Sequence, residues 1–568
     1  MRNIFTEVFC FIFIFSYSQI NSQNIGSASY INVNSIYLPF NNKGVIADVN
    51  GGPNGSGGQF AGGTFLFSSG FWLSGFTNGT LWANGVASAS LVEDYIAGTI
   101  GMDPNDPKAS IYKVTSSDLP FGQSWQDWID AVDLGADFYD GNGDGIYNPV
   151  DLNGNNQWDS DEDKPDLLLD ETYWCVFNDG IPANQRRWHS EPQGIEVRQT
   201  IFASASVGPI GKTIFVRYRI KNTGIVTDTL EDVYFSMWAD PDIGDHTDDV
   251  YGCDIERQAA YYYNKHSDQV YGNQVPSFMM DLLTGPFSYI PGVTFIDNNG
   301  NNIYENGIDT PLDTAFNYLG PIGISIYPGA KNLHTSSCIT YIGGDAVLRD
   351  PNNMQEARNY IIGLTPAGQL PDPCTWAYGN AGNFSGCDTT DPHFWFSGDP
   401  VANVGWLDVN EVDVRGNGTS GPFKLVKDHE VEILVVYEID RSTTPVGGVT
   451  AVKAVSDYTQ NIYENNFGYP IVSVKDNPQI VSDFKLYQNY PNPFNPLTKI
   501  SYSVPTASKV TLIVFDILGK EISTLVNEEK PAGEYEVKFD ATSLPSGTYF
   551  YQLKAGSYIQ TNKMILIK

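Results

Sequence analysis

The stretch Thr213-Ile-Phe-Val-Arg-Tyr-Arg-Ile220 alternates apolar and polar side chains, and a Lys221-Asn-Thr-Gly224 turn follows it. The run Val233-Tyr-Phe-Ser-Met-Trp238 has the composition of a return strand. A period of two places one face of a strand on a core and the other in water. This part of the chain therefore predicts antiparallel β structure with one face exposed to solvent.

Neighbouring stretches extend the same pattern. Residues 195–201 alternate in the same way, and residues 431–439 have a continuous apolar centre that is typical of a buried strand. Residues 25–101 are rich in Gly and Ser, with short aromatic runs that predict strands between turns. High aromatic content, with 55 Gly and 33 Pro, favours many short strands over helices.

Two helices are expected. Trp125, Trp128, Ile129 and Val132 recur at helical spacing, with Ser124 as the candidate N-cap and Gly135 where the helix would stop. We interpret the two Trp residues as core packing. Residues 451–465 form the second predicted helix.

Charge is distributed unevenly along the 568 residues. The net charge is −34, yet residues 480–568 hold 9 Lys against 8 Asp and Glu. The preceding residues therefore carry 23 Lys and Arg against 58 Asp and Glu, a net charge of −35. Such an acidic surface repels nucleic acid and anionic lipid, so no nucleic-acid partner is expected. Either solvent or bound Ca²⁺ can neutralise this charge.

The N-terminus has the pattern of an export signal. Arg2 precedes an apolar run at residues 8–15, and small residues follow, so residues 1–22 are predicted to be a signal peptide. The run is too short for a permanent anchor, and no later stretch reaches about 18 apolar residues. No transmembrane segment is therefore expected.

Five cysteines remain after residue 22, and export makes disulfides possible. Cys374 and Cys387 enclose a Gly- and Asn-rich loop and are the expected pair. Because the number is odd, at least one thiol is expected to be free. No Cys-x-x-Cys spacing occurs, which argues against a thiolate zinc site.

The strongest chemical motif is Asp140-Gly-Asn-Gly-Asp-Gly-Ile-Tyr-Asn-Pro-Val-Asp151. Ca²⁺ takes six to eight oxygen ligands, and a 12-residue loop supplies them from positions 1, 3, 5, 7, 9 and 12. Gly145 stands at position 6, where the chain must turn, and position 12 is Asp instead of the usual Glu. The predicted ligands are Asp140, Asn142, Asp144, the carbonyl of Ile146, Asn148 and Asp151.

A second loop overlaps the first at Asp151. It has the expected Glu at position 12, but Asn156 at position 6, where Gly is usual. Its predicted ligands are Asp151, Asn153, Asn155, the carbonyl of Gln157, Asp159 and Glu162. Over about 25 residues, the two loops resemble the tandem Ca²⁺ repeats of thrombospondin type 3 and dockerin proteins. The alternative is a solvated cluster of Asp, Asn and Gly turns without an ion.

Two further acidic segments are candidates. The looser one comprises Asp297, Asn299, Asn301, the carbonyl of Ile303 and Glu305, with Asp309 nearby. The denser one, residues 240–249, has five carboxylates and His246 directly after a predicted strand. Carboxylates this close repel one another unless a cation or hydrogen-bond donors intervene. A metal site, a catalytic carboxylate pair and a loop that caps its own backbone are all compatible with this segment.

Sequence motifs for enzymes are absent. The chain has no His-Glu-x-x-His, no Gly-x-Ser-x-Gly and no phosphate-binding loop. A glycosidase is not excluded on this ground, because two carboxylates distant in sequence leave no local signature.

The C-terminal segment carries an ordered series of motifs. They are Tyr490-Pro-Asn-Pro-Phe-Asn-Pro496, Ile500-Ser-Tyr502, Val514-Phe-Asp-Ile-Leu-Gly519, Ala532-Gly533, Leu544-Pro-Ser-Gly-Thr-Tyr-Phe550 and Lys563-Met-Ile-Leu566. This series resembles the type A sorting domain of the type IX secretion system of Bacteroidetes-related bacteria. The resemblance implies export through the periplasm to the outer cell surface or the medium. It also implies binding to the secretion machinery through residues 485–568, proteolytic removal of these residues and attachment to surface polysaccharide.

The preceding chain resembles large secreted Bacteroidetes-type proteins that carry such tails, at residues 69–75, 240–245 and 398–401. That resemblance implies no activity.

The sequence thus predicts a mainly β, multidomain protein: a β-sandwich body with Ca²⁺-binding-type acidic loops and a C-terminal immunoglobulin-like β-sandwich. The expected parts are a signal peptide (1–22), a Gly-rich β region (23–120), a helix with tandem acidic loops (121–170), the β-sandwich body (171–475), a linker (476–484) and the sorting domain, here called the tail (485–568). We expect a Ca²⁺-stabilised structural or adhesive protein with no identifiable catalytic site. The alternative is a secreted polysaccharide-active enzyme or a carbohydrate-binding protein.

Overall fold

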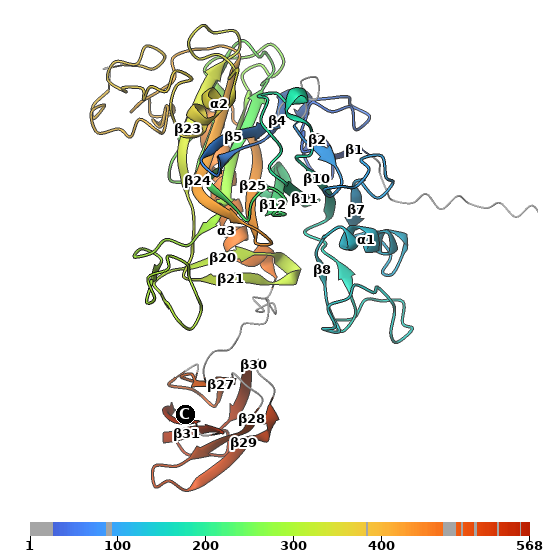
Figure 1. Ribbon diagram of the computed structural model, residues 1–568, viewed down its shortest axis with the longest axis vertical. Coiled ribbons are helices and arrows are strands. Elements are labelled where there is room, and N and C mark those ends of the chain that lie inside the picture. The colour runs from blue at the N-terminus through green and yellow to red at the C-terminus, as the bar shows by residue number, and fades with distance from the viewer. Residues whose placement is uncertain are drawn as a thin grey trace, which may run out of the picture. The chain divides into compact units, whose positions relative to one another are not determined.

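The computed structural model describes residues 27–86, 94–381, 384–469, 484–489, 492–504, 508–530, 533–556 and 558–567 (Figure 1). The predicted signal peptide and residues 476–483 of the predicted linker lie outside these ranges. The chain divides into two compact units. Unit 1 comprises residues 1–286 and 334–461, and unit 2 comprises residues 287–333 and 462–568.

Two antiparallel sheets dominate unit 1. The first has the order β1 (Ala28–Ile31), β2 (Ile36–Asn41), β3 (Gly58–Phe60), β4 (Gly63–Thr77), β13 (Thr229–Pro241), β24 (Val414–Val426) and β23 (Thr335–Ile342), with β5 (Thr80–Gly85) paired to β4. The second has the order β14 (Asp249–Asp254), β15 (Ala259–Asn264), β16 (Pro276–Thr284), β25 (Glu430–Arg441), β12 (Thr213–Asn222), β11 (Ile195–Ala203), β10 (Glu171–Asn178) and β6 (Ile96–Ala97), with β7 (Tyr112–Thr115) paired to β10. Strands from residues 23–120 and from residues 171–475 thus share both sheets.

The strands predicted at residues 213–220 and 233–238 are present, but they do not pair. β12 pairs with β11 and β25, whereas β13 pairs with β4 and β24 in the other sheet. The prediction that one face of β12 is in water is also wrong, since eight of its ten residues are buried. Its outward-facing arginines are covered by carboxylates of residues 137–166, which supply the partners that solvent would otherwise provide.

The inner faces of the two sheets contact each other through aromatic rings. Phe71 of β4 lies 4.9 Å from the ring of Tyr218 of β12 and 6.3 Å from that of Phe177 of β10, between ring centroids. The Cys253–Cys338 disulfide joins β14 of one sheet to β23 of the other. Apolar burial and a covalent link therefore both hold the sheets together.

The other cysteines agree with expectation. Cys374 and Cys387 form the predicted disulfide. Cys175 is the free thiol among the described residues, and it is buried in β10. Burial raises the pKa of this thiol, so it is an unreactive core residue.

The first predicted helix is α1 (Gln123–Asp133), but Ser124 is not its cap. Gly122 occupies the N-cap position, and Ser124 is buried in the first turn. Trp125 and Trp128 are buried as predicted. Gly135 follows the helix with a φ of 104°, and a Cβ there would lie 2.3 Å from the Arg198 side chain. A positive φ and this close contact both explain glycine at the helix end.

Two more helices cover the sheets. The predicted helix at 451–465 is α3 (Gly447–Glu464), and α2 (Met354–Ile361) had not been predicted. Asn353 caps α2 by accepting a hydrogen bond from the Glu356 N–H. Asn-x-x-Glu is a capping signal, so α2 could have been found from the sequence. Short 3-10 helices complete unit 1 at η1 (Ala183–Gln185) and η2 (Pro209–Lys212).

Residues 287–333 of unit 2 form three short antiparallel pairs: β17 (Phe287–Ser288) with β22 (Lys331–Asn332), β18 (Phe295–Ile296) with β19 (Thr310–Pro311), and β20 (Thr314–Tyr318) with β21 (Ile324–Pro328). The turns η3 (Gly320–Ile322) and η4 (Asn466–Gly468) meet through the Asn466 side chain. Its oxygen accepts from the Gly320 N–H at 2.7 Å, and its amide donates to the Gly320 carbonyl at 3.0 Å.

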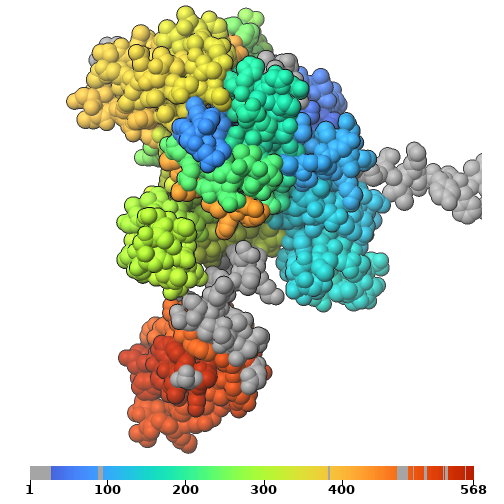
Figure 2. All heavy atoms as spheres, in the orientation of Figure 1, coloured from blue at the N-terminus to red at the C-terminus, as the bar shows by residue number. Residues whose placement is uncertain are grey.

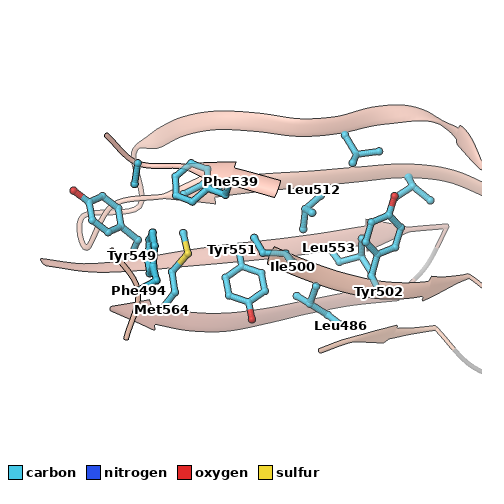
Figure 3. Packing of buried hydrophobic residues seen from close by; sticks show 14 of the residues in the cluster. Leu486, Phe494, Ile500, Tyr502, Leu512, Phe539, Tyr549, Tyr551, Leu553 and Met564 are labelled. Atoms are coloured by element: carbon cyan, nitrogen blue, oxygen red, sulfur yellow. The ribbon is translucent and has the colours of Figure 1, made fainter. Parts of the chain in front are cut away.

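The tail forms two antiparallel sheets around one apolar core. One sheet has the order β26 (Lys485–Leu486), β27 (Leu497–Val504) and β30 (Gly533–Asp540). The other has the order β29 (Glu521–Lys530), β28 (Ser508–Phe515), β31 (Gly547–Ala555) and β32 (Tyr558–Leu566). Figure 3 shows Leu512, Tyr551 and Leu553 among the side chains gathered between the strands.

Candidate metal-binding loops

The acidic segment of unit 1 is closed at its base by two short strands. β8 (Phe138–Tyr139) pairs with β9 (Lys164–Pro165), so the two ends of the segment between them are held side by side. The Lys164 ammonium lies 4.0 Å from the ring centroid of Trp158. Burial lowers the pKa of Lys164. In Figure 2 the cyan part of the surface, which includes this segment, bulges from unit 1.

Loop A comprises residues 140–151. The Asp140 carboxylate accepts the backbone N–H groups of Gly143, Asp144 and Gly145 at 2.6, 3.1 and 3.0 Å. Gly145 has a φ of 77°, as the predicted turn at position 6 requires. The Asn142 amide donates to the Asp144 carboxylate at 3.1 Å, so the side chains of positions 3 and 5 meet.

Loop B comprises residues 151–162 and repeats this arrangement. The Asp151 carboxylate accepts the N–H groups of Gly154, Asn155 and Asn156 at 2.6, 3.2 and 2.7 Å. These hydrogen bonds hold the pKa of Asp151 below its usual value, so the side chain remains a carboxylate. Asn156, at position 6, has a φ of 57°. Asn adopts a positive φ less favourably than Gly does, in keeping with the departure noted in the sequence.

The side chains at positions 3, 5 and 9 of loop B converge. The amides of Asn153 and Asn155 both donate to the same oxygen of Asp159, at 2.7 and 2.8 Å. Glu162 closes the loop, because its two carboxylate oxygens accept the N–H groups of Leu152 and Asp159 at 2.7 and 2.9 Å. The last residue of the loop thus ties position 2 to position 9.

Loop C, residues 297–309, lies in unit 2 and has the same pattern. The Asp297 carboxylate accepts the N–H groups of Gly300 and Asn302, each at 2.7 Å. The amides of Asn299 and Asn301 both donate to one oxygen of Glu305. Asp309 closes this loop by accepting the N–H groups at positions 2 and 9, Asn298 and Glu305, each at 2.8 Å.

Comparison of the three loops identifies the residue that closes loop A by hydrogen bonds. This residue is Asp163, whose oxygens accept the N–H groups of Gly141 and Asn148 at 3.1 and 2.8 Å. Counting to position 12 predicts Asp151 as a metal ligand of loop A, and that assignment stays a prediction. Asp151 is also the first residue of loop B. Asp163 is 1% exposed. Its position next to Glu162, the closing residue of loop B, is the sequence feature from which its role could have been predicted.

The common base of loops A and B is fixed to the outer face of the nine-stranded sheet by an ion-pair network. Asp166 follows β9 and pairs with the Arg217 guanidinium, and Asp137 precedes β8 and pairs with Arg219 at 2.5 Å. Arg217 also lies 3.5 Å from Asp137. Burial would raise the pKa of Asp137, but the two arginines outweigh it and lower that pKa. For Asp166 burial prevails, and its pKa is raised.

The segment 240–249 is held by protein groups. Asp240 pairs with the Arg415 guanidinium at 3.0 Å, and Asp249 accepts from the Ile243 N–H at 3.3 Å. Burial raises the pKa of Asp240 to about 7 and that of Asp242 to about 6. The loop therefore caps part of its own backbone, which was one of the three interpretations left open by the sequence.

The donor groups of the three loops are carboxylates, side-chain amides and backbone carbonyls. Among the residues that the structure describes, no group of three or more His, Cys, Asp or Glu side chains could hold a metal ion. Carboxylates alone therefore do not complete a coordination shell. Ca²⁺ accepts amide and backbone carbonyl oxygens as well, and loops A, B and C contain these in the expected positions.

Within the same described ranges, no helix is long and apolar enough to cross a membrane.

Comparisons with known proteins identify the tail. Residues 488–568 match the family of secretion system C-terminal sorting domains. This match confirms the type IX sorting tail and indicates export to the cell surface or secretion. No curated protein matches the chain.

Among solved structures, a polysaccharide lyase matches at 8% identity and a TM-score of 0.15, over 66% of this chain and 34% of that one. The chain thus spans about a third of the length of that protein. A likeness at this TM-score carries no argument about fold or activity.

Proposed function

We propose that this exported protein is a Ca²⁺-stabilised structural or adhesive protein of the cell surface. The sorting tail directs export, and the acidic chain that precedes the tail is the part that is delivered to the cell surface. Loops A, B and C act as ion-binding braces, and the common base of loops A and B is tied to the sheet by Arg217 and Arg219. Surface polysaccharide is the proposed site of attachment once the tail has been recognised.

The main support for the calcium proposal is that the side chains at positions 3, 5 and 9 meet within loop B and again within loop C. In loops B and C, two Asn amides donate to the carboxylate at position 9. These amide N–H groups stabilise, by hydrogen bonds, a carboxylate that a cation would otherwise stabilise. Rotation of each amide by half a turn directs its oxygen inward, and carboxamide and carboxylate oxygens together are ligands that Ca²⁺ accepts.

Ca²⁺ titration tests this proposal. The full chain, stripped of metal by a chelator, is titrated calorimetrically and melted with and without Ca²⁺ at millimolar concentration. We expect heat of binding and a rise in Tm, because an ion that binds the folded state alone stabilises it. Asp159→Ala and Glu305→Ala are expected to abolish the response of their own loops. Absence of both heat and Tm shift in the unaltered chain would sink the proposal.

We also infer that the body is a β-sandwich and that the tail is an immunoglobulin-like sandwich. Antiparallel sheets of three and four strands around a shared core support the latter. An experimental structure of the tail tests it, with the crossing angle of the two sheets as the readout.

A glycan array with a hydrolysis screen tests the adhesive role, and turnover of any polysaccharide would replace that role by an enzymatic one.

A further inference from the structure

Large apolar side chains are unevenly exposed on the tail. Among its described residues, five such side chains are exposed: Leu497 (55%), Ile517 (68%), Leu518 (87%), Ile559 (56%) and Ile567 (53%). Single exposed apolar residues need no explanation, but a cluster of them often marks a site of protein contact. The strand register decides whether these five are clustered.

Four of the five lie at one end of the tail. Phe515, just before Ile517, pairs with Phe550, which in turn pairs with Lys563 near the end of β32. Ile567 donates its N–H to the Phe494 carbonyl at 3.0 Å, and Leu497 follows Phe494 by three residues. The β28–β29 turn, the start of β27 and the end of β32 are therefore together. We call Leu497, Ile517, Leu518 and Ile567 the apolar end.

The chain joins the tail at the opposite end. Lys485 pairs with Ser503, six residues along β27 from Leu497, which corresponds to about 20 Å at the rise of a strand. Phe484 stacks on Tyr558 at the start of β32, with ring centroids 5.5 Å apart. Ile559, the fifth exposed residue, is next to Tyr558. The apolar end thus lies at the far end of the tail's strands from the point where the preceding chain arrives.

The tip that carries Ile517 and Leu518 is a fixed turn. The Asp516 carboxylate accepts the N–H groups of Leu518 and Lys520 at 2.9 and 3.0 Å. Gly519 donates to the Asp516 carbonyl at 3.0 Å and has a φ of 78°, which favours glycine. A preorganised turn loses less entropy on binding than a flexible one. Two apolar side chains are therefore presented in water at little cost of ordering.

We propose that the apolar end is the surface by which the tail docks into an apolar pocket of a protein component of the type IX secretion machinery. This inference rests on the sorting role given by the family match. The chain that precedes the tail reaches it at the opposite end, beside Phe484, so the apolar end is not the surface from which that chain continues. Removal of four large apolar side chains from water drives the docking.

Export of the full chain in a type IX-secreting host tests the proposal. The variant Ile517→Ser/Leu518→Ser changes only exposed side chains, so the tail core stays intact. The protein is quantified in the periplasm, on the surface and in the medium. We expect the exported fraction to fall about tenfold or more, as for truncation of central interface residues. Ile559→Ser, with similar exposure at the linker end, is the control and is expected to be exported normally.

Other outcomes would overturn the proposal. Export of the double variant at the level of the unaltered chain would do so, as would an equal defect in Ile559→Ser. Self-association or vesicle binding that the double variant abolishes, with export unchanged, would assign the apolar end to a second copy or to lipid. Removal of residues 484–568 distinguishes failure of the docking proposal from failure of the sorting role. If the chain without these residues is still exported, the tail does not sort the protein. If this chain is not exported but the double variant is, the tail sorts the protein and only the proposed docking surface is wrong.

Discussion

Residues 27–469, which include the predicted β-sandwich body and are together called the body from here on, and the tail bury different kinds of groups. In the tail, the buried polar residues among those described are Asn489, Thr498 and Ser503, all uncharged. The body instead buries ionisable side chains, among them Arg217, Glu438 and the aspartates at 166, 240, 249 and 281. A neutral core is stabilised mainly by apolar burial, whereas buried charges must be paired, protonated or bound to a cation. The difference predicts that solution conditions affect the body more strongly than the tail.

Tryptophan fluorescence can separate the two regions. All 11 Trp residues precede residue 407, so none lies in the tail. Fluorescence therefore reports unfolding of the body alone, while circular dichroism reports both regions.

The largest expected effect is that of Arg217→Ala in the body. It leaves Asp166 buried without its cation, and breaking a buried ion pair in this way costs about 3–5 kcal/mol. Urea denaturation followed by Trp fluorescence measures it. Lys424→Ala, which removes the exposed pair with Glu231, is the control and is expected to cost about 0–1 kcal/mol. Similar losses in both variants would contradict the role of the network.

The matching change in the tail is Leu512→Ala. Leu512 is 0% exposed in the tail core, and truncation of a buried Leu costs about 2–5 kcal/mol. The loss should appear in circular dichroism and leave the Trp transition unchanged. Leu518→Ala, at an 87% exposed position, should change stability by less than about 0.5 kcal/mol. A shift of the Trp transition in Leu512→Ala would mean that the two regions unfold together.

Local patterns in the sequence predicted the elements well. Alternation located the strand at 213–220, a continuous apolar centre located the strand at 431–439, and the motif series identified the tail. Local patterns did not predict the partners. The strands at 213–220 and 233–238 read as a hairpin, yet they lie in different sheets, because pairing depends on which distant strands complete each sheet.

The acidic loops show the same limit at the level of single residues. The first residue of each of loops A and B binds its own neighbouring N–H groups, so spacing alone located Asp140 and Asp151. The closing residue of loop A is Asp163, 23 positions from Asp140, because the chain returns along β9. Position counting within a 12-residue window could not reach it.

Asp163→Asn tests this assignment with a smaller expected effect. At about 100 times its Kd, a bound ion stabilises the folded state by about 2.7 kcal/mol. Loss of the closing charge should remove about 1.5 kcal/mol or more of the Ca²⁺-dependent gain, because a hydrogen bond to a charged group contributes about 1.5–3 kcal/mol. Asp161→Asn, at an exposed neighbouring position, is the control. An equal Ca²⁺ response of the Asp163→Asn body and the unaltered body would contradict the closing role of Asp163.

The smallest effect concerns pH and a buried acid pair beneath α3. Asp281 pairs with Val436, and Glu438 pairs with Met279 on the same two strands, so the two carboxyls are diagonal neighbours. Ser456 of α3 donates to Asp281 at 2.6 Å. A hydroxyl near Glu438 is that of Thr459 on the same helix, and it donates to the Val455 carbonyl at 2.9 Å. The charged groups nearest to the two carboxyls are Asp254, Arg257 and Asp457, at the β14–β15 turn and on α3.

Burial raises the pKa of Asp281 from 3.8 to about 7 and raises that of Glu438 as well. The folded state therefore holds more protons than the unfolded state between about pH 4 and 7, and stability falls as the pH rises through this window. One such proton changes stability by about 1 kcal/mol between pH 6 and 7. We expect Asp281→Asn to flatten the pH dependence of the Trp-monitored transition, whereas exposed Asp428→Asn should not. An unchanged slope in Asp281→Asn would show that other buried acids of the body control its response to pH.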